Sequence, residues 1–229
     1  MTQEMIIFAH LLNDYSGSPK ILRLVINSLK GEFKCQKDLL LFVGAGSEGI
    51  LSEADVSVVR YWYKRSGSRW LTLVSYVGSQ AVLFYKLLTR RNTPRNAIVY
   101  VNTLLPFGAA LYGWLTRRPV IYHIHEVSVT PALLRWFLVL IVRLTSKANI
   151  YVSRAHSKEL PIRGVPYRVV YNALDGATVS RAGDFTYEPR RNGKFNVLMV
   201  SSLRDYKGVP ELVQLCMRLS ARVDIEFHL

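Results

Sequence analysis

The sequence predicts an α/β protein in which a doubly wound parallel sheet is followed by the first βαβ unit of a second, incomplete domain. Two observations support this prediction. Short apolar runs typical of buried strands alternate with helical segments throughout residues 1–175, as in a parallel sheet covered on both faces. The alternation stops in the Gly-, Pro- and Arg-containing residues 176–194, which we interpret as a linker, and resumes over residues 195–229.

Composition narrows the class of partner. Half of the 229 residues are hydrophobic, and 30 Lys and Arg against 16 Asp and Glu give a net charge of +14. This excess favours an anionic partner, such as nucleic acid, anionic lipid or a phosphorylated substrate. The two cysteines, Cys35 and Cys216, indicate a reducing compartment without a disulfide framework. No secretory signal is visible, so a cytoplasmic location is expected.

The first strand is predicted at Met5–His10, a short apolar run bounded by polar residues. A turn of small residues follows, in which Ser18 is placed as the N-cap of an amphipathic helix that begins with Pro19 and extends to about Lys30. The free N–H groups of such a helix N-terminus can bind a phosphate, although a plain strand-to-helix turn has the same sequence.

Strands and helices continue to alternate after this turn. Further strands are predicted at 39–43, 56–63 and 98–101, the second of them as an exposed strand, and a helix is predicted at 107–115. The long apolar segment 70–88 approaches the length of a membrane span, but its polar positions favour a buried crossover helix.

The stretch from Pro119 to Ser128 is the most informative of the chain. It begins as a strand with apolar residues on both faces, as expected in the middle of a parallel sheet, and it ends in His123, His125 and Glu126. Ligands of open α/β sheets bind outside the carboxyl ends of the strands, so His125 and Glu126 are expected at the rim of a ligand crevice. Packing offers another explanation for His123, as a core histidine bonded to a backbone carbonyl.

The remaining elements complete the pattern. The helix predicted at 131–147 is apolar nearly all round, so it either packs deep in the domain or meets a membrane surface with its exposed part. Strands are predicted at 149–152 and 167–171, with Ser153 as the cap of a short helix that carries His156. Beyond the linker, one βαβ unit is formed by strand 195–200, helix 208–220 and strand 223–227.

Five motifs follow one another along the chain: His10–Pro19, His123–Glu126, Tyr151–Ser153, Asn172–Asp175 and Ser201–Gly208. In this order they resemble motifs of the retaining nucleotide-sugar glycosyltransferases of family 4, which have the two-domain, Rossmann-like GT-B fold. The first resembles the family's loop under the donor diphosphate, the second its strand-end histidine, and the last its phosphate turn. The resemblance covers essentially the whole chain.

The resemblance implies that a hexosyl-type sugar is transferred from a nucleotide diphosphate donor to a hydroxyl, with retention and without a cofactor or metal. The resemblance also implies a glycan or lipid acceptor, as in polysaccharide or glycolipid biosynthesis, and a peripheral location on the inner face of the cell membrane. The residues implied are His125 for catalysis, Gly17, Ser18, Arg204 and Lys207 for the donor, and His10, Asn13 and Glu126 for the acceptor. Lys207 and Glu126 also have a simpler explanation as solvated side chains near helix starts.

The chain departs from the family pattern at three points. Ser202 stands where the phosphate turn has an arginine, Ala173 replaces a glycine, and the Glu-x7-Glu element that holds the donor would lie beyond Leu229. We therefore expect the 229-residue chain to be inactive by itself. The alternative function is a non-catalytic or partner-dependent subunit on a membrane. A nucleic-acid binder is disfavoured, because the aromatic residues mostly fall within apolar periodic segments.

Basic clusters add a prediction of peripheral binding to anionic membranes. With helix 131–147, the residues expected to contribute are Lys64, Arg65, Arg69, Arg90, Arg91, Arg117 and Arg118.

Overall fold

A computed structural model describes residues 5–31, 38–44, 48–126, 129–186, 193–201, 203 and 205–228. The chain divides into two compact units, which we call the N-terminal unit (Met1–Ala173) and the C-terminal unit (Leu174–Leu229).

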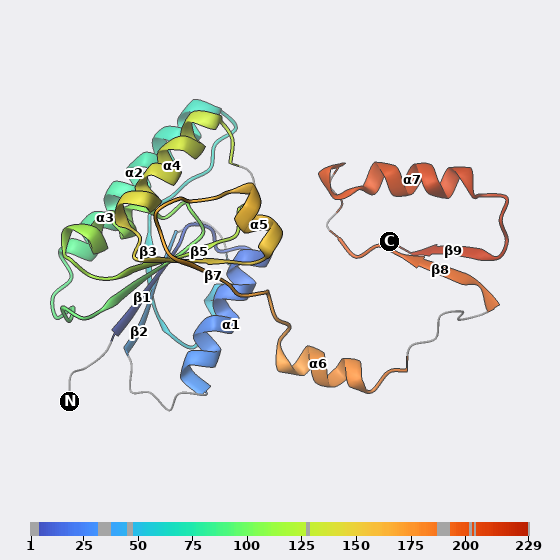
Figure 1. Ribbon diagram of the computed structural model, residues 1–229, viewed down its shortest axis with the longest axis horizontal. Helices are drawn as coiled ribbons and strands as arrows, with labels where there is room; N and C mark the ends of the chain where they lie inside the picture. The colour runs from blue at the N-terminus through green and yellow to red at the C-terminus, as the bar shows by residue number, and fades with distance from the viewer. Residues whose placement is uncertain are drawn as a thin grey trace. The chain divides into compact units, whose positions relative to one another are not determined.

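The described residues of the N-terminal unit form one sheet of seven parallel strands (Figure 1). The strands lie in the order β3-β2-β1-β4-β5-β6-β7, so the direction of winding reverses between β1 and β4. Their bounds are β1 (Met5–His10), β2 (Asp38–Gly44), β3 (Ser57–Tyr61), β4 (Ile98–Asn102), β5 (Val120–Ile124), β6 (Ala148–Tyr151) and β7 (Tyr167–Val169). This confirms the predicted doubly wound parallel sheet.

Helices cover both faces of this sheet (Figure 1). On one face lies α1 (Gly17–Gly31), whose Leu22 and Ile26 pack with apolar residues of β1 and β2. The other face is covered by α2 (Arg69–Leu88), α3 (Phe107–Leu115) and α4 (Ala132–Thr145). The short elements are η1 (Ile50–Glu53) and α5 (Arg154–Glu159). Ser153 caps α5 as predicted, because its hydroxyl accepts a hydrogen bond from the His156 N–H at 3.0 Å.

The start of α1 differs from its prediction. The helix begins at Gly17, so Ser18 lies inside the first turn and is not the N-cap. The carboxylate of Asp14 instead shapes the turn, since it accepts a hydrogen bond from the Ser16 N–H at 3.0 Å.

The prediction that 70–88 is a buried helix is also wrong in part. The side of α2 that faces the protein buries Tyr76, Leu83 and Leu87, but Trp70, Val74 and other large apolar side chains lie exposed on the opposite side. The hydrophobic pattern alone did not show which side of this helix faces the sheet.

The C-terminal unit contains the predicted βαβ unit. Strands β8 (Phe195–Leu198) and β9 (Ile225–His228) pair in parallel, and η3 (Asp205–Lys207) and α7 (Val209–Arg218) connect them. Residues 176–194, which were predicted as a linker because they lack apolar periodicity, contain the short helix α6 (Gly176–Gly183). Asp175 starts this helix, because its carboxylate accepts a hydrogen bond from the Thr178 N–H at 2.9 Å.

Candidate active site

Polar side chains gather where β1, β4 and β5 end. His10 is the last residue of β1, Asn102 is the last of β4, and His123 lies near the end of β5. These three strands are neighbours in the sheet, on both sides of the point where the winding reverses. All three side chains are buried. The sequence therefore places a polar cluster at the position where open α/β sheets bind ligands.

Asn102 connects the members of this cluster. Its Nδ2 donates a hydrogen bond to the Ser18 carbonyl at 3.1 Å, and its Oδ1 lies 3.0 Å from Nε2 of His125. The Nδ1 atom of His10 lies 3.1 Å from Asn102 Nδ2 and 3.2 Å from the Asn102 carbonyl oxygen. Three residues predicted from two separate motifs, His10, Ser18 and His125, thus meet around one asparagine.

Sequence reasoning missed Asn102 as a site residue. The available signal was a polar side chain that ends an apolar strand, as at His125. What the sequence lacks is the strand order, which alone shows that this residue stands between β1 and β5.

The histidines of the cluster are neutral at physiological pH. Burial lowers the pKa of His10 and of His123 to about 4. Burial and, to a smaller extent, the neighbouring histidines lower the pKa of His125 to about 3. The rings of His123 and His125 lie with their centroids 4.2 Å apart, which makes a charge on either ring unfavourable. The cluster therefore offers neutral imidazole donors and acceptors.

Two of these rings have a nitrogen without a partner among the described residues. The Nε2 atoms of His10 and His123 are buried and make no hydrogen bond. Because the oxygen of the Asn102 amide accepts from Nε2 of His125, the other nitrogen of that ring is left as an acceptor. Buried polar atoms are nearly always hydrogen-bonded in folded proteins, so unpartnered ones next to a helix N-terminus indicate a place for a polar ligand.

Glu126 follows the cluster and holds the loop between β4 and α3. Both of its carboxylate oxygens lie 3.1 Å from the Leu104 N–H nitrogen, and one accepts from the His125 N–H at 3.3 Å. Burial raises the pKa of Glu126, while these hydrogen bonds act in the opposite direction. The carbonyl oxygen of Glu126 lies 2.6 Å from Nε2 of His156. The carboxylate of Glu126 thus holds backbone N–H groups of the loops that follow β4 and β5, and its carbonyl oxygen contacts a side chain of α5.

Asn13 holds the other side of the site. Its Oδ1 accepts a hydrogen bond from the Leu51 N–H at 3.0 Å, and its Nδ2 donates to the Ser52 hydroxyl at 2.8 Å. Gly49 permits this arrangement, because a Cβ atom there would lie 2.5 Å from the Asn13 carbonyl group. These contacts fasten η1 to the loop that leads into α1.

The predicted donor-binding residues fall in both units. Gly17 opens α1, and a Cβ atom added there would meet nothing within 4 Å, so there is space beside this residue. Lys207 ends η3 in the C-terminal unit. Arg204 lies outside the described residues. No group of three or more His, Cys, Asp or Glu within the described ranges is placed to hold a metal ion.

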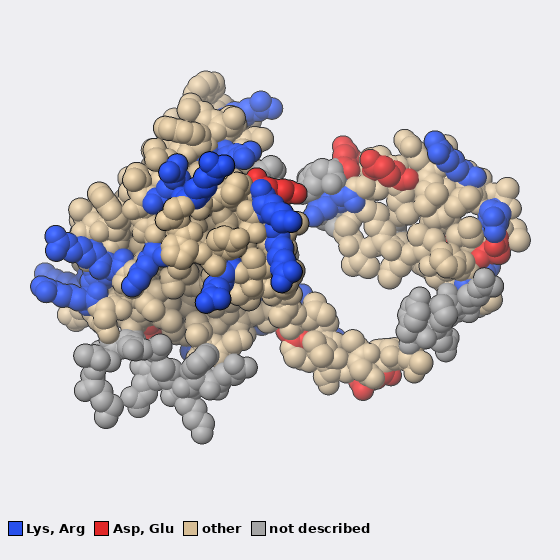
Figure 2. Space-filling view, viewed as in Figure 1, with Lys and Arg blue, Asp and Glu red and all other residues tan. Residues whose placement is uncertain are grey.

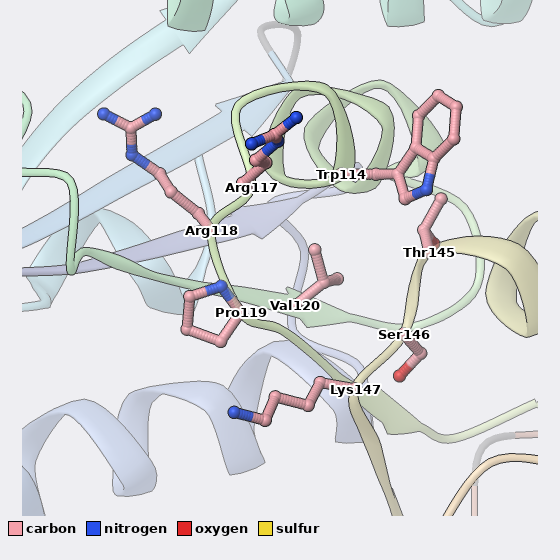
Figure 3. A pocket seen from close by; sticks show the side chains of 8 residues that line it. All are labelled: Trp114, Arg117, Arg118, Pro119, Val120, Thr145, Ser146 and Lys147. Atoms are coloured by element: carbon pink, nitrogen blue, oxygen red, sulfur yellow. The ribbon is translucent and has the colours of Figure 1, made fainter.

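A separate hollow lies at the opposite edge of the sheet (Figure 3). It has a volume of about 460 Å³ and includes Val120, where β5 begins, whereas the histidine cluster lies where β5 ends. The side chains around it come from the ends of α3 and α4 and the loops that follow: Trp114, Arg117, Arg118, Pro119, Thr145, Ser146 and Lys147.

Comparison with known proteins shows the fold. No family model matches the chain, and no curated protein matches it in sequence. HepE from Anabaena, in complex with UDP and glucose, is 18% identical with a TM-score of 0.57, over 97% of this chain and 68% of that one. The lipopolysaccharide outer core galactosyltransferase WaaB is 10% identical with a TM-score of 0.59, over 98% of this chain and 67% of that one.

A third solved structure agrees with these two. The α,α-trehalose 6-phosphate synthase from Burkholderia multivorans is 12% identical with a TM-score of 0.62, over 99% of this chain and 63% of that one. The chain thus spans 63% to 68% of the length of these structures. Together the likenesses show the predicted α/β fold of the Rossmann-like GT-B type.

Proposed function

We propose that the protein transfers a sugar from a nucleotide diphosphate donor to a hydroxyl group, with retention, as a member of glycosyltransferase family 4. The observation that carries the proposal is the junction at Asn102, which joins His10, His125 and the start of α1 at the carboxyl edge of the sheet. HepE, which was solved with UDP and glucose, and the galactosyltransferase WaaB share this fold. The acceptor that we propose is a glycan or a lipid-linked glycan.

The residues of the cluster suit the neutral part of the substrates. A neutral His125 can accept a hydrogen bond from a sugar hydroxyl, and Asn102 fixes its ring orientation from the other side. His10 offers its unpartnered Nε2 atom to the acceptor side. Asn13 and Glu126 act as positioning residues, since they hold the loops on either side.

The anionic part of the donor needs a different kind of contact. The N–H groups of Gly17 and Ser18 at the positive end of α1 are suited to the diphosphate. Negative charge grows on the leaving diphosphate as the glycosidic bond breaks, and Lys207 and Arg204 would stabilise it. No metal or cofactor is required in this proposal.

The experiment is a transfer assay on the complete gene product, with a panel of nucleotide sugars and with release of the nucleoside diphosphate as the readout. His125→Ala should reduce transfer by about 100-fold or more, as is usual when a contact to the reacting centre is lost. The melting temperature should stay within a few degrees, because His125 lies at the partly exposed end of a strand. The anomeric configuration of the product, read by NMR, tests retention.

The control is His228→Ala, which removes an exposed histidine of β9. It should leave transfer unchanged. Full activity of His125→Ala would contradict the assignment of that residue. Hydrolysis or epimerisation of the donor without transfer to any acceptor would contradict the proposed reaction, and binding without turnover would favour the non-catalytic subunit.

A further inference from the structure

The excess positive charge of the protein lies entirely in one segment. Residues 56–158 contain fifteen of the 30 Lys and Arg side chains but only one of the 16 Asp and Glu side chains, Glu126. The rest of the chain contains equal numbers of basic and acidic residues. The segment includes α2, α3 and α4, the three helices on one face of the sheet. Figure 2 shows many Lys and Arg side chains, and few acidic ones, on the visible side of the N-terminal unit.

Helix α2 buries polar side chains beside its apolar ones and exposes large apolar side chains on its outer side. Its buried side includes Ser75, Ser79 and Gln80. Gln80 accepts a hydrogen bond from the Gly108 N–H of α3 at 3.1 Å, and a Cβ atom at Gly108 would lie 2.3 Å from the Gln80 carbonyl oxygen. The two helices thus approach closely through small and polar residues, as helices do in an apolar medium.

The exposed side of α2 is largely apolar, with the exposed cations Arg69 and Lys86 near its two ends. Its large exposed side chains are Trp70, Leu71, Val74, Val77, Tyr85 and Leu88, and the small exposed Ala81 lies midway between Val77 and Tyr85. By length and composition α2 is the one described helix that is long and apolar enough to cross a membrane, although a core helix can pass the same test. Its contacts with α3 and the sheet favour a helix that lies along a membrane surface instead.

The neighbouring helices continue this apolar surface. Helix α3 contacts both α2 and α4. It exposes Trp114 and Leu115, and α4 exposes Leu133, Trp136 and Leu144. Trp62, which is also exposed, lies 3.7 Å from a Cβ atom built at Gly78 of α2. The four tryptophans of the protein therefore lie on or beside this helical layer, and tryptophan favours the boundary between lipid and water.

Basic side chains border the apolar surface. Helices that connect parallel strands end at the amino edge of the sheet, so the cations that follow α2, α3 and α4 come to one edge: Arg90, Arg91, Arg117, Arg118 and Lys147. Three of them line the 460 Å³ hollow beside Trp114 (Figure 3). Arg118 is held in place, because it donates to the carbonyl oxygens of Thr93 at 2.9 Å and Pro94 at 3.1 Å.

We propose that the exposed faces of α2, α3 and α4 form a docking surface for an anionic lipid bilayer. Apolar side chains would enter the headgroup region, and the border of Lys and Arg would pair with lipid phosphates. Charge argues against the same face as a dimer interface, because two copies would bring two strongly basic surfaces together. The sequence predicted that helix 131–147 contributes to membrane binding. The structure adds α2, which exposes more large apolar side chains than α4 does.

The experiment is flotation of the protein with vesicles of phosphatidylcholine alone and of two parts phosphatidylcholine to one part phosphatidylglycerol. Binding should require phosphatidylglycerol and should weaken as salt is added. The triple variant Trp70→Ser, Val74→Ser and Val77→Ser should reduce the partition coefficient by about tenfold or more, since three exposed apolar side chains lose their burial in lipid. Arg91→Gln and Arg117→Gln, at exposed positions of the basic border, should each reduce it by about fivefold.

Matched controls lie elsewhere on the N-terminal unit. Val170→Ser with Tyr171→Ser removes exposed apolar side chains that follow β7, and Arg163→Gln removes an exposed cation. Both should leave vesicle binding unchanged. Equal losses in the controls, equal binding to neutral vesicles, or a protein dimer that the triple variant abolishes would each overturn the proposal. Because the readout is vesicle binding, its failure leaves the proposed transfer reaction untouched.

Discussion

The two units of the chain use the same βαβ connection but differ in how much they bury. In the N-terminal unit, apolar clusters form on both faces of a sheet of seven described strands. In the C-terminal unit, the described sheet has two strands, and Leu212 is the one described apolar side chain that is buried. Each added strand widens the sheet, so that neighbouring helices pack on one continuous apolar surface. The fraction of the chain's surface that is buried on folding therefore rises with the size of the unit.

The comparison also explains where a polar site can exist. Among the residues that the structure describes, the N-terminal unit buries three histidines and three asparagines. Burying each of them has an energetic cost, which the apolar clusters around the strands offset. The described part of the C-terminal unit has no buried polar residue. Its predicted donor residue Lys207 instead lies exposed, at the end of η3.

The largest expected difference between the units is in their resistance to proteolysis. The βαβ unit of residues 195–229 cannot offset the ordering entropy of its own backbone, which is roughly 1–2 kcal/mol per residue. We expect a protease to cut first within residues 176–229 and to leave the N-terminal unit intact, which mass spectrometry of a limited digest would show. Equal resistance of the two units would contradict this picture of the C-terminal unit.

The next largest expected difference between the units is the effect of a core substitution on the free energy of unfolding. Leu22 is fully buried between α1 and the sheet, so Leu22→Ala should lower the free energy of unfolding by about 2–5 kcal/mol. The four tryptophans lie at positions 62, 70, 114 and 136, so their fluorescence in urea reports the N-terminal unit alone.

Leu212→Ala is the matched variant in the C-terminal unit. It should leave the tryptophan unfolding curve unchanged, because Leu212 belongs to a unit without a tryptophan. A shift as large as that of Leu22→Ala would show that the two units unfold together, contrary to our expectation.

Much of this fold could be predicted from the sequence, because buried strands and helix caps are local signals. The bounds of Met5–His10 and Phe107–Leu115 agree with the structure residue by residue. The exposed apolar side of α2 could not be predicted in the same way, since periodicity assumes that the apolar side faces inward. Helix α6 was missed although Asp175 and Thr178 have the spacing of an N-cap and its partner.

The candidate site was predictable only in pieces. His10 and Ser18 were found from one motif and His125 from another, but their common neighbour Asn102 was not found. Glu126 and Asn13 were expected to bind the acceptor, and that prediction remains untested. Their hydrogen bonds to backbone N–H groups depend on loops 22 to 38 residues away in the sequence, which no local pattern shows.

The smallest predicted effect is a pH dependence that belongs to the N-terminal unit alone. His10 has a folded pKa of about 4 against 6.5 when unfolded, because burial penalises its charged form. Its neutral form supports the fold fully above pH 6.5, and stability falls from pH 6.5 to 4 as the unfolded chain binds the proton more readily. The shift corresponds to about 3 kcal/mol at most. Glu126 has the opposite effect on stability. Its pKa is raised in the folded state, so its contribution becomes more favourable to folding as the pH falls.

The test is urea unfolding, followed by tryptophan fluorescence, at neutral pH and near pH 4.5. His10→Asn keeps a side-chain amide near the position of Nδ1, the ring atom that contacts Asn102, but it cannot take up a proton. The variant should therefore lose less stability than the parent protein as the pH falls, by about 2 kcal/mol near pH 4.5, and the contribution of Glu126 is common to both proteins. His228→Asn, in the C-terminal unit, is the control and should follow the parent curve. If His10→Asn and the parent protein lose stability equally, His10 is not held neutral by burial, and the interpretation of the cluster as a set of neutral imidazoles fails.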